Sequence, residues 1–358
     1  MTSATMMMPL LAHDVLPAPP PRQNRQKSSV YHHHLLQASS VPARTSTISV
    51  GGLAYGIHVV GSTAFVACLT HVSWIHLHEK CSLGRVHVSG PARSVVATSN
   101  GKSAYVACHT GGLSIIHTTP SLHVGDHFNI PAVGVAMSTS VAVVVCDLMG
   151  VCFFDTRSHT WTSMLPLAVG GTTFRAKAVQ VLHDRYAYIA CDAGMVVVVD
   201  FIDARHPVIL TAKRLFSGDA HAIALTSSAA YIACGARGVA VIDLEQLKAL
   251  GVVKTAYGSV FDVHLDQSSR RLLCACQVGG LAVYDISDDD GMSLTFVGQT
   301  NAFDGICHGV GSTKDKIRSR EVGVVTCQSG GVQVVVLDAV ETWPEPKRAR
   351  LADACTLM

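Results

Sequence analysis

The stretch AYIACDAGMVVVVD (residues 187–200) places an apolar run ending in cysteine before a polar turn and a second apolar run ending in aspartate. Runs rich in Val, Ile, Ala and Tyr on either side of a glycine-containing turn predict a β-hairpin. Because both arms are apolar on both faces, each strand must be covered on two sides. The same pattern occurs seven times in the chain, and this repetition determines the fold class.

The seven copies share a cysteine at the end of the first arm, which recurs about every 40 residues. The other six hairpins are AFVACLTHVSWIHL (64–77), AYVACHTGGLSIIH (104–117), AVVVCDLMGVCFFD (142–155), AYIACGARGVAVID (230–243), LLCACQVGGLAVYD (272–285) and GVVTCQSGGVQVVV (323–336). The anchor cysteines are Cys68, Cys108, Cys146, Cys191, Cys234, Cys276 and Cys327.

Two further strands are predicted upstream of each hairpin. The strand next to the hairpin is rich in small residues, as expected where strands crowd around an axis, and the one before it is more polar, as expected of an exposed outer strand. The small-residue strands are AYGIHV (54–59), ARSVVA (92–97), AVGVAM (132–137), AKAVQV (176–181), AHAIAL (220–225), VFDVHL (260–265) and FDGICH (303–308). Four strands in each of seven repeats predict an all-β fold, a seven-bladed β-propeller of four-stranded blades.

The propeller is predicted to span residues 45–338. A spare outer strand, TSTISV, opens this region, and the seventh repeat stops after its third strand. We therefore predict that Thr45–Val50 pairs with Val332–Leu337, so that an N-terminal strand completes the last blade and leaves no open edge. Residues 1–44 are predicted to be a disordered tail, and residues 339–358 an extended C-terminal tail with a basic cluster.

The hairpin at 187–200, together with FIDARHP (201–207), resembles the LVIVD repeat, a propeller repeat that ends in an apolar run and aspartate. The closing position is occupied by Asp155, Asp200, Asp243 and Asp285. The chain contains no Trp-Asp pair, which distinguishes it from WD-repeat propellers. The resemblance covers roughly residues 45–338, and it implies a fold without a common activity.

Composition narrows the function classes. Apolar residues make up 49% of the chain and charged residues 15%, which favours a large core over disorder. A net charge of +2 argues against nucleic acid as a partner. Residues 133–154 are apolar enough to cross a bilayer, but their register with the repeats favours two buried strands. The twelve cysteines without a secretory signal predict a cytoplasmic protein. The scarcity of acidic residues before position 79 leaves a mitochondrial location as the alternative.

Topology predicts the binding surface. In a propeller, the turns between second and third strands and the segments leading into the innermost strands lie on one face, here called the turn face. We predict a non-enzymatic, monomeric scaffold without a cofactor, which binds a protein or peptide partner there. The predicted contact residues are Tyr55, Arg93, His109, Asp147, Lys177, Asp192, His221, Arg237, Phe261 and Asp304, with His71 as a further candidate. The segment GSTKDKIRSRE (311–321) is predicted to be a surface loop.

A propeller hydrolase or lactonase with an axial metal is the alternative. Its metal ligands would come from His58, Asp262, His264 or His308, but the equivalent positions in other blades are Val96, Ala136, Gln180 and Ala224. The anchor cysteines recur on different blades, so they are predicted to be buried hydrophobes and not metal ligands. Cys274 and Cys276 are expected to point to opposite faces of their strand.

The last four residues, Cys355-Thr356-Leu357-Met358, fit a C-a-a-X box, which predicts prenylation of Cys355. Upstream lie Lys347, Arg348 and Arg350, which would supply a second, electrostatic contact with the cytosolic face of a membrane. The alternative interpretation is a coincidental C-terminal cysteine next to an unrelated basic cluster.

Overall fold

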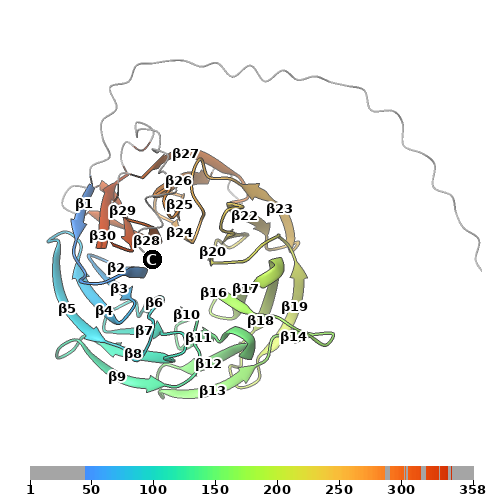
Figure 1. Ribbon diagram of the computed structural model, residues 1–358. Coiled ribbons are helices and arrows are strands. Elements are labelled where there is room, and N and C mark those ends of the chain that lie inside the picture. Colours follow the sequence, from blue (N-terminus) through green and yellow to red (C-terminus); the bar gives the residue numbers. More distant parts are fainter. Residues whose placement is uncertain are drawn as a thin grey trace, which may run out of the picture. The chain divides into compact units, whose positions relative to one another are not determined.

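Seven four-stranded antiparallel sheets form a ring in the computed structural model of the chain (Figure 1). The structure describes residues 45–286, 291–301, 303, 305–315, 320–329, 331–337 and 340. In six blades, the strands run in chain order from the centre of the ring to its circumference. The predicted fold class, an all-β propeller with seven blades, is confirmed.

The first three blades use the strands before residue 166. Blade 1 contains β2 (Ala54–Val60), β3 (Thr63–Cys68), β4 (His71–His76) and β5 (Cys81–His87). Blade 2 contains β6 (Ser94–Ala97), β7 (Ser103–Ala107), β8 (Leu113–His117) and β9 (His123–Phe128). Blade 3 contains β10 (Gly134–Met137), β11 (Val141–Val145), the 3-10 turn η1 (Asp147–Met149), β12 (Val151–Asp155) and β13 (Thr160–Leu165).

The remaining blades follow the same plan, with a small additional hairpin before blade 4. This hairpin is β14 (Ala168–Val169) and β15 (Thr172–Thr173). Blade 4 contains β16 (Ala176–Leu182), β17 (Tyr186–Cys191), η2 (Asp192–Gly194), β18 (Met195–Asp200) and β19 (Val208–Arg214). Blade 5 contains β20 (Ala222–Leu225), β21 (Ala229–Ala233), β22 (Val239–Asp243) and β23 (Lys248–Val253). Blade 6 contains β24 (Asp262–Asp266), β25 (Arg271–Ala275), β26 (Leu281–Ile286) and β27 (Leu294–Thr300).

The last blade is completed by the N-terminal strand. It contains β28 (Cys307–Asp315), β29 (Arg320–Cys327), β30 (Gly331–Val336) and, outermost, β1 (Thr45–Ile48). β1 pairs antiparallel with β30, with Thr45 opposite Val335 and Ile48 opposite Val332. The predicted ring closure is confirmed for these residues.

The core lies between neighbouring blades, where apolar faces of adjacent sheets pack together. Between blades 3 and 4, for example, Val145 and Phe153 pack with Ile189 and Val197 in one buried cluster. The anchor cysteines are buried in these layers, as predicted. Residues 133–154 form β10, β11 and β12, as their register with the repeats predicts. In the described part of the chain, no helix is long and apolar enough to span a membrane.

The glycines that end the hairpin turns allow the outer strand to approach closely. Gly194 has a φ of +76°, and a Cβ there would lie 1.8 Å from the carbonyl oxygen of Phe216. Gly331 has a φ of +72°, and a Cβ there would lie 2.6 Å from the carbonyl oxygen of Ile48. The carbonyl of Ile48 in β1 therefore approaches Gly331 as the carbonyl of Phe216, two residues after the end of β19, approaches Gly194.

Three sequence predictions are corrected by the structure. The segment 311–321 is not a loop where it is described, because β28 continues to Asp315 and pairs with the valine-rich β29. The innermost strand of blade 7 begins at Cys307, which pairs with Cys327, and not at residue 303. Cys274 and Cys276 lie in the same buried cluster, since side chains two residues apart in a strand share a face.

Candidate functional site

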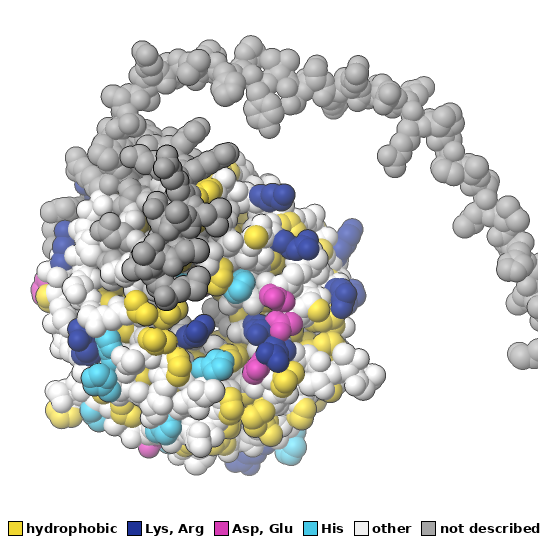
Figure 2. Space-filling view, viewed as in Figure 1, with side chains coloured by type: hydrophobic (Ala, Val, Ile, Leu, Met, Phe, Trp, Pro, Cys, Tyr) yellow, Lys and Arg dark blue, Asp and Glu magenta, His cyan; other side chains and the backbone are white. Residues whose placement is uncertain are grey.

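A cavity of about 790 Å³ opens around the ring axis, between the innermost strands. Several of the predicted contact residues line it, each from the start of an innermost strand or from the segment leading into one. They are Tyr55, Arg93, Lys177, His221 and Phe261, and His308 joins them from blade 7. On the surface in Figure 2, acidic and basic side chains gather beside the centre of the ring.

Aromatic rings follow one side of this cavity in a continuous arc. The rings of His221 and Phe261 stack with centroids 4.2 Å apart. Phe261 meets His308 at 5.6 Å, and His308 meets Tyr55 at 4.8 Å. The guanidinium of Arg93 lies over Tyr55, 5.3 Å from the ring centroid. These five residues, here called the aromatic arc, come from five consecutive blades, in the order 5, 6, 7, 1 and 2.

The turn face of blades 3 and 4 carries a cluster of ion pairs. The Nε atom of Arg175 lies 3.3 Å from Asp147 Oδ1 and 3.7 Å from Asp192 Oδ2. Lys177 Nζ also lies 3.7 Å from Asp192 Oδ2. Burial raises the pKa of Asp192, while Lys177 opposes this shift. Sequence reasoning missed Arg175, although its position two residues before Lys177 in the same segment was a usable signal.

Two turns beside this ion-pair cluster expose apolar side chains. Leu148 and Met149 in η1 are 53% and 41% exposed, and Val169 in the β14–β15 hairpin is 45% exposed. These three residues are not among the contact residues predicted from the sequence. Gly170-Gly171 between Val169 and Thr172 was the available signal for the hairpin, because both glycines have positive φ.

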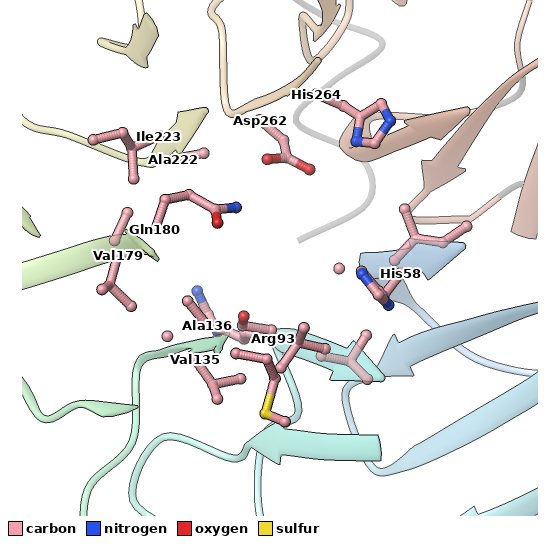
Figure 3. Close-up of a pocket in the computed structure, with 18 of the residues that line it drawn as sticks. His58, Arg93, Val135, Ala136, Val179, Gln180, Ala222, Ile223, Asp262 and His264 are labelled. Atoms are coloured by element: carbon pink, nitrogen blue, oxygen red, sulfur yellow. The ribbon is translucent and has the colours of Figure 1, made fainter. Parts of the chain in front are cut away.

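Deeper in the cavity, polar side chains from blades 1, 4 and 6 face the axis (Figure 3). His58 Nδ1 accepts a hydrogen bond from the Ala97 backbone N–H at 3.0 Å, so the neutral ring carries its proton on Nε2. Burial, and secondarily the nearby His264, lower the pKa of His58 to about 4. His264 Nε2 lies 3.0 Å from Ser312 Oγ.

Asp262 contributes a carboxyl group to this part of the cavity. Its Oδ1 accepts from the Val263 backbone N–H, and its Oδ2 accepts from the Val310 backbone N–H, both at 2.9 Å. Burial raises the pKa of Asp262 to about 7. In the described ranges, no group of three or more His, Cys, Asp or Glu side chains is arranged to hold a metal ion.

The other predicted contact residues lie away from the cavity. His109 and Arg237 are exposed on the turns of blades 2 and 5. His71 is not available at the surface, because it is 3% exposed and its Nε2 lies 2.9 Å from the Val50 carbonyl oxygen in the closing segment. Asp304 lies outside the described residues, as do the C-terminal positions Lys347, Arg348, Arg350 and Cys355.

Comparison with known families identifies one repeat. The LVIVD repeat family matches residues 175–209, which span β16, β17, β18 and the start of β19. The closing residue of that repeat, Asp200, accepts the backbone N–H of Ile202 at 3.0 Å and pairs with Arg185 at 2.7 Å. The protein is thus a seven-bladed β-propeller whose fourth blade matches the LVIVD repeat family. A comparison with curated proteins finds no match.

Proposed function

We propose that this propeller is a non-enzymatic scaffold and that its turn face binds a protein partner. One observation carries the proposal: an open cavity with an aromatic arc, an ion-pair cluster and exposed apolar side chains occur together on one face. Protein interfaces are enriched in aromatic residues, Met and Arg, and they surround an apolar centre with polar groups.

The exposed apolar residues support a macromolecular partner in particular. Leu148, Met149 and Val169 would each gain free energy by leaving water, at roughly 25 cal/mol per Å² of apolar surface buried. Asp147 and Arg175 stand next to them and would fix the orientation of the partner through charge complementarity. The cavity alone could accept a small ligand, but the patch outside it requires a partner that covers a wider surface.

The geometry of the axis disfavours the alternative hydrolase with an axial metal. A histidine binds a metal through a nitrogen lone pair, and the Nδ1 lone pair of His58 already accepts the Ala97 N–H. Both carboxylate oxygens of Asp262 accept backbone N–H groups. His58 and Asp262 thus each use acceptor capacity on the backbone of the innermost strands, His58 on Ala97 of blade 2 and Asp262 on Val310 of blade 7.

We further propose that the scaffold works in the cytoplasm, where a prenyl group on Cys355 and the basic residues Lys347, Arg348 and Arg350 tether it to a membrane. A single lipid chain binds membranes only marginally, so the three basic residues would provide the needed second contact. The basis of this proposal is the C-terminal sequence alone.

The scaffold proposal is tested with an identified partner. The partner is captured from native cells, identified by mass spectrometry and titrated as a purified protein against variants of the propeller. The double variant Leu148→Asp with Met149→Asp, and the charge reversal Lys177→Glu, should weaken binding by about tenfold or more. The matched control is Ile202→Asp, because Ile202 is 73% exposed and follows the closing Asp of blade 4.

The variants at Leu148, Met149 and Ile202 should keep the wild-type melting temperature, because these side chains are exposed. The melting temperature of Lys177→Glu is measured alongside its affinity, because Lys177 pairs with Asp192. If Ile202→Asp weakens partner binding as much as the turn-face substitutions do, the turn face is excluded as the binding surface. Protection of the outer strands from hydrogen exchange on binding, with no protection of the turns, would also contradict the proposal.

A further inference from the structure

The residues that line the central cavity favour a ligand of particular chemistry. We propose that it receives an acidic segment of the partner, with an aromatic side chain packed on the aromatic arc and a neighbouring carboxylate bound by Arg93. This inference rests on the proposed function and names the chemistry that the same face recognises.

The aromatic arc provides the apolar half of the site. All five of its members line the cavity, which is of the size that commonly buries a compact ligand. The contacts between neighbouring rings at 4.2, 5.6 and 4.8 Å hold the arc together without filling the cavity. An inserted aromatic ring would continue these stacked and edge-to-face contacts.

Positively charged side chains outnumber carboxyl groups among the described residues that line the cavity. Arg93 and Lys177 are its cationic residues, and Asp262 is the carboxyl group among the described lining residues. Burial raises the pKa of Asp262 to about 7, which weakens the negative charge that this carboxyl contributes to the cavity near neutral pH. Lys177 has Asp192 as a counter-ion. Among the described residues, no carboxylate forms an ion pair with Arg93, whose contact is the face of Tyr55.

A cationic ligand is the main competitor, because aromatic rings around a cavity often bind ammonium groups. Here Arg93 already occupies the face of Tyr55, and a second cation would be repelled by Arg93 and Lys177. Burial lowers the pKa of His221 and of His308, so neither ring is cationic near pH 7 and each retains one N–H donor. A carboxylate, in contrast, would receive charge-assisted hydrogen bonds from Arg93.

The test uses fluorescein-labelled peptides of equal length in fluorescence anisotropy titrations with the full-length protein. The probe carries Asp-Trp-Asp between Gly-Ser flanks, and three matched peptides replace this core with Lys-Trp-Lys, Asp-Gly-Asp or Gly-trimethyllysine-Gly. The Asp-Trp-Asp peptide should bind about tenfold or more tightly than each of the others, since both the ring and the carboxylates contribute.

Variants then locate the binding. Arg93→Gln should weaken binding of the Asp-Trp-Asp peptide by about tenfold or more, which is the effect of losing a charge-assisted hydrogen bond. Phe261→Leu should also weaken it, because the variant keeps an apolar side chain but lacks the ring that stacks with the inserted aromatic group. Arg157→Gln is the matched control, because Arg157 is exposed at the closing turn of blade 3 and does not line the cavity.

The results separate the two proposals. Equal or tighter binding of the Lys-Trp-Lys or trimethyllysine peptide, absence of binding by Asp-Trp-Asp, or an unchanged affinity in Arg93→Gln overturns the acidic-segment inference. If the captured partner still binds the propeller and still loses affinity with the Leu148 and Met149 substitutions, the scaffold proposal stands without it. If no turn-face substitution changes the affinity of the partner, the scaffold proposal fails even if the Asp-Trp-Asp peptide binds.

Discussion

Removal of residues 1–52 should strongly destabilise the protein, because it takes away the outermost strand of blade 7. The truncation removes the side chains of Ile48 and Val50, which are 2% and 1% exposed. Burial of each contributes about 1.5–3 kcal/mol. It also removes the Val50 carbonyl, which lies 2.9 Å from His71 Nε2 and 3.0 Å from Ser73 Oγ. Both partners are buried, and an unsatisfied buried polar group costs about 1–3 kcal/mol.

Together these losses amount to on the order of 5–12 kcal/mol, which is comparable to the whole free energy of unfolding of a typical domain, about 5–15 kcal/mol. At roughly 2 °C per kcal/mol for a ring of this size, the melting temperature should fall by at least about 10 °C. Calorimetry and circular dichroism melts measure the change, with deletion of residues 1–40 as the control that retains β1.

A pair of point variants makes the same test without truncation. Ile48→Asp places a charge in the buried layer between blades 7 and 1, whereas Ser49→Asp adds the same side chain at the exposed neighbouring position. Equal melting temperatures for the two truncations, or for the two point variants, would show that β1 does not close the ring in solution.

Three further predictions follow from the core, the axis and the C-terminus. Cys108→Ala should lower the free energy of unfolding by about 1 kcal/mol and Cys108→Ser by more, because serine buries a hydroxyl. The thiol of Cys108 in the wild-type protein should react slowly with alkylating reagents in the native state, since burial raises the pKa of this thiol to about 11. Because the pKa of His58 is about 4 in the fold and 6.5 in the unfolded chain, the unfolded state binds the proton between these values. Stability should therefore fall as pH drops from 6.5 to 4, by up to about 3 kcal/mol from this residue. In urea titrations, His58→Asn should lose less stability than the wild type between pH 6.5 and 4. An identical pH dependence of stability in both proteins would refute the lowered pKa of His58. Cys355→Ser should shift the protein from the membrane to the soluble fraction, with a prenylated C-terminal peptide in the wild type by mass spectrometry; equal solubility and an unmodified peptide ending in Met358 would exclude the anchor.

Much of the architecture could be predicted because it depends on local periodicity. Two continuous apolar runs around a glycine turn specify a hairpin, and seven copies in register specify the number of blades. Even ring closure followed from counting strands, since the surplus strand at 45–50 matched a deficit after residue 337. The errors arose where the repeat departs from its pattern, as in blade 7, where valines in β29 extend the pairing through residues 311–315.

Only part of the candidate site could be predicted from the sequence. The repeat register assigned Tyr55 and Phe261 to the same face, because topology places the starts of all innermost strands there. Only the tertiary structure could decide that their side chains join His221, His308 and Arg93 in one arc, since these contacts link five blades that are distant in sequence. Side-chain direction around an axis depends on the tilt and stagger of neighbouring sheets, and a one-dimensional repeat contains no measure of either.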